Sequence, residues 1–151
     1  MPGLELLQTL IEQVPQRVKS LPSSASSKPS ASKWSAKEEF GHLIDSAANN
    51  HQRIVRAQLE DGPSMPGYDG DAWVALHRYQ EASWSELVNR WAALNRQLLA
   101  AAQAVSESAW SRTLTVGDSK RLTLRFVFHH YLDHMMHHLE HMGVQVSDLR
   151  G

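Results

Sequence analysis

The residues with the most chemical potential lie in the segment HHYLDHMMHHLEHM, residues 129–142. This segment holds six of the nine histidines in the chain. Neutral imidazole is the commonest protein ligand for transition metals, and two imidazoles one helical turn apart can bind the same ion. If the segment is helical, its histidines spaced four residues apart are therefore candidate metal ligands.

The apolar residues of this segment predict one buried helical face: Phe128, Tyr131, Leu132, Met135, Leu139 and Met142. In a helical projection with His134 at zero, that face spans from about 60° to about 160°. His138 then lies at about 40°, so His134 and His138 are the histidine pair with one-turn spacing that is closest to the buried face. The spacing explains no role for the remaining four: His129, His130, His137 and His141.

Two imidazoles are too few for a catalytic site of the zinc type, which takes three protein ligands and leaves a position open. The chain has no cysteine, so the third ligand must be His, Asp or Glu. The preceding helical pattern offers His51 on an apolar face and His42 on a polar face beside Asp45. The periodicity does not decide between them, and a solvated histidine face without metal is the simpler alternative.

Four segments with helical periodicity must position these side chains: about residues 4–21, 35–60, 82–105 and 123–142. Pro15 is expected to kink the first segment. Ser35 and Glu38 form a capping-box sequence at the start of the second, and Gly143 is a typical glycine just beyond the end of the last.

The connecting segments are rich in Ser, Pro, Gly and Asp, notably residues 21–32 and 61–71. A short helical turn is expected around Trp73, and residues 110–121 are expected to form a small hairpin or an ordered loop. These patterns predict a single all-α domain over residues 1–151, a four-helix bundle. Its helices should run mostly up and down, with a long loop between the third and fourth.

The composition excludes several classes of partner. The formal net charge is -1, and the basic residues are scattered rather than gathered into the stripe that a nucleic acid would need. No segment reaches the roughly 20 apolar residues of a membrane span, and the N-terminus lacks the pattern of a secretory signal. We therefore expect a cytoplasmic protein that binds neither nucleic acid nor membrane. An apolar stripe left exposed on a long helix predicts a homodimer.

Four sequence blocks together resemble the DinB-like superfamily, in particular its YfiT-like branch of metal-dependent hydrolases and thiol transferases. The blocks are WSAKE at residues 34–38, GHLIDS at 41–46 continuing to Arg53, PGYD at 66–69 with AW at 72–73, and HYLDHMMHH at 130–138. Each block is short, but their order and spacing span residues 34–142. The resemblance implies a DinB/YfiT-like four-helix bundle that binds one divalent metal ion through His42, His134 and His138. It thereby favours His42 over His51.

The resemblance also implies a function. An ion held by three neutral histidines with open positions could activate water for hydrolysis, or a low-molecular-weight thiol for transfer to a small-molecule substrate. Imidazole suits zinc, nickel and iron alike, so the sequence does not identify the metal. The alternative from another class is a non-catalytic bundle that binds or senses a metal.

Three further residues are candidates for the chemistry. Asp45, one turn beyond His42, could act as a base or orient a ligand, or it could be a surface carboxylate. Arg53 and Tyr68 could bind an anionic or polar substrate, with a salt bridge in the bundle as the alternative for Arg53. Trp34 and Trp73 are expected to serve packing rather than substrate binding.

Overall fold

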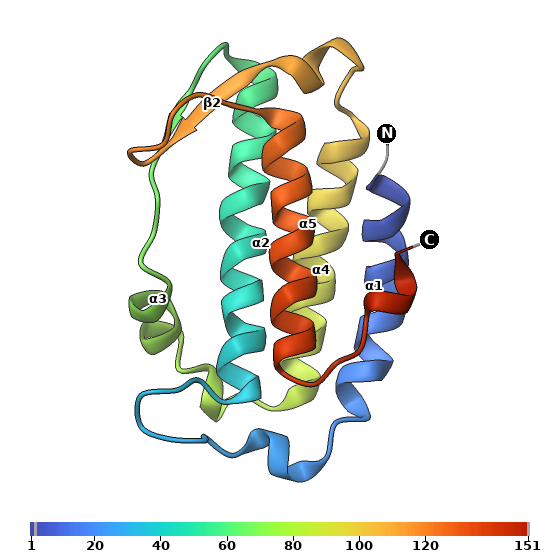
Figure 1. The fold of residues 1–151 in the computed structure, drawn as a ribbon, viewed down its shortest axis with the longest axis vertical. Helices are drawn as coiled ribbons and strands as arrows, with labels where there is room; N and C mark the ends of the chain where they lie inside the picture. The colour runs from blue at the N-terminus through green and yellow to red at the C-terminus, as the bar shows by residue number, and fades with distance from the viewer. Residues whose placement is uncertain (2, 151) are drawn as a thin grey trace.

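The computed structural model describes residues 1 and 3–150, and its four long helices form a bundle (Figure 1). These helices are α1 (Leu4–Lys19), α2 (Ala36–Leu59), α4 (Trp84–Gln103) and α5 (Leu124–His141). A shorter helix, α3 (Gly70–His77), lies outside the bundle beside α2. The predicted all-α four-helix bundle is thus confirmed.

Successive long helices of the bundle run in opposite directions, except for one pair. Helices α1 and α2 run antiparallel, as do α4 and α5, but α2 and α4 run parallel (Figure 1). They can do so because residues 60–83 cross back along the bundle and carry β1 (Ser64–Met65), α3 and the 3₁₀ turn η2 (Tyr79–Glu81). This crossover is the segment that covers the outer side of α2.

The predicted long connection between the last two long helices contains β2 (Thr113–Val116) and β3 (Leu122–Thr123). These strands pair antiparallel, and β1 joins β2 in parallel, which gives a three-stranded sheet at one end of the bundle. Three further 3₁₀ turns are η1 (Ser23–Ser26), η3 (Ser108–Ser111) and η4 (Ser147–Leu149).

The helix boundaries follow from capping residues. The Ser35 hydroxyl accepts a hydrogen bond from the backbone N–H of Glu38, whose carboxylate accepts one from the backbone N–H of Ser35. This confirms the predicted capping box. Gly143, with φ of 96°, takes the left-handed conformation just after Met142, the residue that caps α5. Helix α1 continues through Pro15.

The largest fully buried side chains of the core include Trp91, Trp110, Tyr131 and Phe40. The side chain of Leu59, the last residue of α2, is 80% exposed. In contrast, α2 buries polar residues, among them Glu39, His42 and Asp45. No helix among the described residues is both long enough and apolar enough to span a membrane.

Candidate metal centre

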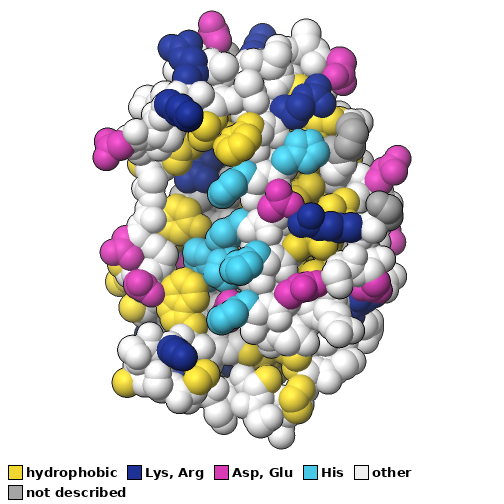
Figure 2. Space-filling view, viewed as in Figure 1, with side chains coloured by type: hydrophobic (Ala, Val, Ile, Leu, Met, Phe, Trp, Pro, Cys, Tyr) yellow, Lys and Arg dark blue, Asp and Glu magenta, His cyan; other side chains and the backbone are white. Residues whose placement is uncertain are grey.

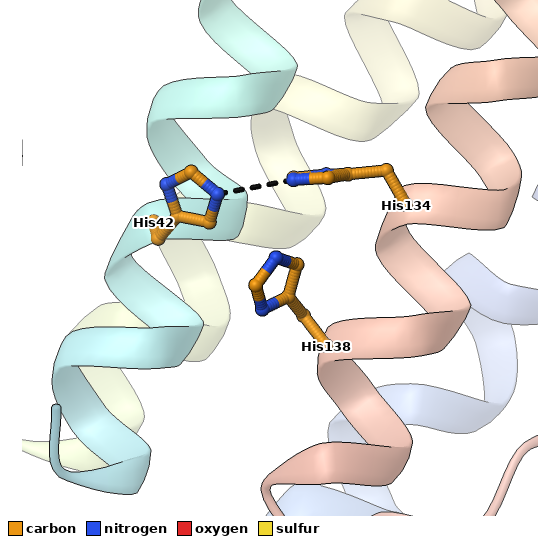
Figure 3. A group of neighbouring side chains, drawn as sticks. All are labelled: His42, His134 and His138. Atoms are coloured by element: carbon orange, nitrogen blue, oxygen red, sulfur yellow. Dashed lines mark hydrogen bonds between the residues drawn. The ribbon is translucent and has the colours of Figure 1, made fainter. Parts of the chain in front are cut away.

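Three histidines from two helices converge on one point (Figure 3). His42 projects from α2, and His134 and His138 project from successive turns of α5. The Nε2 atoms of His42 and His134 are 3.1 Å apart, and ligand nitrogens of all three rings lie within 4.8 Å of one another. The structure therefore brings together the three predicted ligands, whereas His51 lies outside the group.

The spacing and chemistry of these rings fit a metal ion. Nitrogens bound at about 2.0–2.1 Å in a tetrahedral site lie about 3.4 Å from one another, close to the His42–His134 spacing. Burial, reinforced by the charge of nearby His138, lowers the pKa of His42 to about 4 and that of His134 to about 3. Both rings are thus neutral at pH 7, which is the form that binds a metal.

Glu39 fixes the orientation of His138. Its side chain is buried, and its Oε1 accepts hydrogen bonds from Nδ1 of His138 at 2.9 Å and Nδ1 of His141 at 2.7 Å. Burial alone would raise the pKa of Glu39, but the hydrogen bonds and charges of these two histidines outweigh it, and the pKa lies below its usual value. The bonded Nδ1 leaves Nε2 of His138 available to the centre, the usual arrangement in carboxylate–histidine–metal sites.

The sequence pattern was not used to predict a role for Glu39, although its spacing from His42 indicates one. Glu39 precedes His42 by three residues on α2, which places both on one face of the helix. It also accounts for His141, which had no assigned role. His137 stacks on His141, and His130 stacks on Phe126.

The side of the centre facing away from the core has aromatic walls. The Trp34 ring lies 4.8 Å from that of His42 and 6.5 Å from that of His138, measured between centroids. Tyr68 lies 6.4 Å from His42, and Trp73 packs on Tyr68 at 5.2 Å. Trp34, expected to serve packing alone, therefore contacts two of the three histidines.

A cavity of about 400 Å³ opens beside His138, with Trp34 and Glu39 in its lining. On the same face of the molecule, histidine side chains form a stripe flanked by hydrophobic side chains (Figure 2). The three-histidine centre is thus reachable from solvent at an edge of the bundle rather than sealed in its core.

Asp45 is not a surface carboxylate. It is 2% exposed, its Oδ1 accepts a hydrogen bond from the Tyr79 hydroxyl at 2.6 Å, and Nδ1 of His77 lies 3.0 Å from the same oxygen. Burial raises its pKa, against the opposing effect of these partners. Its contacts join α2 to α3 and η2, so a role as a base stays a prediction.

Arg53 lies half-buried on α2, and its NH1 donates a hydrogen bond to Asn50 Oδ1 at 3.3 Å. No ion pair formed within residues 1 and 3–150 includes Arg53, so the salt bridge considered for it is not found there. Asn50 also donates to the backbone oxygen of Ser46 at 2.9 Å, and the Ser46 hydroxyl lies 3.5 Å from Nδ1 of His134. A line of polar side chains on α2 thus leads from the histidines to Arg53.

A sequence model of the DinB superfamily matches residues 6–142. The chain belongs to the DinB superfamily. This assignment confirms the resemblance that had favoured His42 over His51.

Two relatives of this DinB-superfamily protein have names that make them candidate metal-dependent hydrolases. YfiT of Bacillus subtilis is 29% identical over 117 residues, covering 72% of this chain and 62% of YfiT. OB0782 of Oceanobacillus iheyensis is 30% identical over 115 residues, covering 72% of this chain and 63% of the relative. The match therefore spans less than two thirds of either relative.

Solved structures confirm the fold. YfiT from B. subtilis, described with an unusual four-helix bundle topology, aligns with a TM-score of 0.73 at 21% identity, covering 95% of this chain and 87% of YfiT. The mycothiol-dependent maleylpyruvate isomerase aligns with a TM-score of 0.75 at 14% identity, covering 94% of this chain and 60% of the isomerase. The bundle of the present chain is thus shared with both proteins.

Proposed function

We propose that this DinB-superfamily protein is a metal-dependent enzyme acting on a small molecule, with His42, His134 and His138 holding one divalent ion. The observation that carries the proposal is the convergence of three imidazoles, two of them held neutral by burial, beside an open cavity. When bound, such an ion would favour the deprotonated form of a thiol or of water and so supply a nucleophile at neutral pH.

Other residues of this chain would orient a metal ligand, enclose the site and contact the substrate. Glu39 holds His138 in the orientation that directs Nε2 inward, and Trp34 walls the site on one side. Tyr68 and Arg53 would contact the substrate, and Asp45 would serve as a base or hold α3 in place. A homodimer and a cytoplasmic location stay predictions.

The comparisons support both versions of the chemistry. The relatives named as candidate hydrolases favour water, whereas the neighbour named as a mycothiol-dependent isomerase favours a low-molecular-weight thiol. Both need a substrate that approaches the metal centre from solvent. The cavity beside His138 offers such an approach.

Metal analysis of untagged protein tests the site. We expect about one equivalent of a divalent metal (zinc, nickel or iron) in the wild type, and much less after His42→Ala, His134→Ala or His138→Ala. His51→Ala is the matched control, because it removes a histidine from the same helix outside the cluster. A wild-type content well below one equivalent, or one that these three changes do not alter, would contradict the assignment.

Turnover tests the reaction. Metal-loaded protein should transfer a thiol of the bacillithiol, mycothiol or glutathione type to a chromogenic electrophile, or hydrolyse a chromogenic ester. Asp45→Asn should lower the rate about 10²-fold or more if Asp45 moves a proton, with metal content unchanged. Full metal content without turnover in either assay would instead support a metal-binding or sensing bundle.

A further inference from the structure

Arg53 sits in the lining of a second cavity, of about 250 Å³, which is formed by α2, the β2–β3 hairpin and the start of α5. The walls are apolar at Val116, Leu122, Phe126 and Val127, and no carboxylate of the described residues lines the cavity. Apart from Arg53, the polar groups in the lining are Asn50, Ser119 and His130. The cavity therefore combines an apolar surface with one permanent positive charge.

The guanidinium of Arg53 has unused hydrogen-bonding capacity. It carries five N–H donors, yet its one hydrogen bond among the described residues goes to the neutral side chain of Asn50. A half-buried charge without a counter-ion costs free energy, and a bound anion would offset that cost. Burial lowers the pKa of Arg53, but a guanidinium remains charged at physiological pH.

Phe126 supplies an independent observation at the rim of the same cavity. Its side chain is 51% exposed, although most large hydrophobic side chains of the chain are buried. It stacks on His130, with the rings 5.8 Å apart at 27°. An apolar group bound in the cavity would cover this exposed ring.

Taken with the proposed function, on which it rests, the geometry points to a substrate that carries a carboxylate bound by Arg53 and an apolar body lying against Phe126. A carboxylate fits better than a phosphate ester, because one guanidinium pairs with it through two parallel hydrogen bonds and neutralises its single charge. His130 lies one turn, about 6 Å along the axis of α5, from His134. The reacting end of an elongated substrate would thus point toward the three histidines.

Binding by metal-free protein tests this inference. In chelator-treated full-length protein, nuclear magnetic resonance titration with 4-phenylbutyrate should shift the signals of Asn50, Phe126 and the Arg53 Nε–H. The carboxylate should bind at least about tenfold more tightly than 4-phenylbutyramide, because charge-assisted hydrogen bonds are lost in the amide. Equal affinities for the two probes, or shifts located elsewhere on the molecule, would overturn the proposal. Tighter binding of phenyl phosphate would overturn the choice of a carboxylate.

Variants of Arg53 test whether this residue causes the preference for the carboxylate. Arg53→Met should remove the preference for the carboxylate while leaving the weak binding of the amide within about twofold. Arg53→Lys keeps the charge but loses the planar fork, so it should retain part of the preference and serves if the methionine variant does not fold. Arg56→Met is the matched control, since Arg56 is exposed on the same helix and does not line this cavity. A preference unchanged in Arg53→Met and Arg53→Lys would overturn the role of Arg53.

His42→Ala separates this inference from the proposed function. This variant lacks one predicted metal ligand but keeps the Arg53 cavity, so it should bind 4-phenylbutyrate as the wild type does. Loss of metal with carboxylate binding intact would leave both proposals standing. Normal metal content in the wild type without a preference for the carboxylate would overturn the substrate class alone.

Discussion

At the scale of single residues, the centre depends on side chains whose partners lie far away in the sequence. Periodicity alone selected His134 and His138, because both lie on one helix and share a face with its apolar residues. His42 was not selected in this way, since α2 is buried on more than one side and its polar residues are buried too. Glu39 was missed because its partners, His138 and His141, are about a hundred residues away.

Glu39→Gln tests the orientation of His138. The amide keeps a hydrogen-bond acceptor but loses the negative charge that favours the Nδ1–H form of His138. We expect metal affinity to fall by about 10- to 100-fold, as measured by competition with a coloured chelator. His141→Ala removes the other partner of Glu39 and should have a smaller effect. Equal affinity in Glu39→Gln and the wild type would show that Glu39 serves only to satisfy buried hydrogen bonds.

The lowered pKa values of His42 and His134 predict how the stability of the metal-free protein depends on pH. An unfolded histidine titrates near pH 6.5, whereas in the fold these two titrate near 4 and 3. As the pH falls below about 6.5, the unfolded chain takes up protons that the folded chain does not. Their contribution to stability is therefore complete above pH 6.5 and is lost as the pH falls toward 3.

Urea unfolding of metal-free protein should thus show a lower free energy of unfolding at about pH 4.5 than at about pH 7.5, with about 5 kcal/mol attributable to the two rings. His134→Gln removes one of these groups, so its stability should depend less steeply on pH. An identical pH dependence in this variant and the wild type would contradict the assigned shift of His134.

At the scale of elements, α2 and η2 pack closely against each other beside the centre. A Cβ atom added at Gly41 would lie 2.0 Å from the ring of Tyr79, so only glycine allows this ring to pack on α2. The same tyrosine donates its hydroxyl hydrogen to Asp45. Gly41 and Asp45 thus hold the crossover against the helix that carries His42.

Gly41→Ala should therefore destabilise the protein. The clash costs about 1–3 kcal/mol, and the better helix propensity of alanine returns no more than about 1 kcal/mol. Gly67→Ala is the matched control, because an added Cβ there meets no atom within 4 Å. The free energies of unfolding of both variants in urea check this. A Gly41→Ala variant as stable as the wild type would show that the Tyr79 ring can move away at little cost.

The helices and their approximate bounds could be predicted from the sequence, but the directions in which the helices run relative to one another could not. The capping box at Ser35 and the glycine at 143 mark helix ends through local hydrogen bonds and φ angles, which are encoded locally. The parallel course of α2 and α4 depends on the path of residues 60–83, in which no repeating pattern indicates a direction. The position of Trp34 beside the histidines could likewise not be predicted, since an aromatic residue before a helix is more often a packing residue.

At the scale of the whole molecule, one ion would connect α2 to α5, whose ligands His42 and His134 are 92 residues apart in the chain. A ligand that binds only the folded state stabilises it by about 2.7 kcal/mol at a hundred times its dissociation constant. For a chain of this length we expect the melting temperature to rise by about 5–10 °C on loading and to fall again with a chelator. His42→Ala should show no such shift, whereas His51→Ala should behave as the wild type. A shift that persists in His42→Ala would place the ion elsewhere.

The metal ligands and the aromatic walls of the centre lie in different parts of the fold, so each can change in evolution without the other. All three histidines are on α2 and α5, whereas Trp34, Tyr68 and Trp73 belong to segments outside the four long helices. Such connections tolerate changes of length at little cost, about 0.6 kcal/mol for each doubling. A chimera that takes residues 61–69 from a relative should therefore keep its metal and its stability while accepting different substrates. One bundle could in this way diversify into a series of catalysts by exchanging its outer connections.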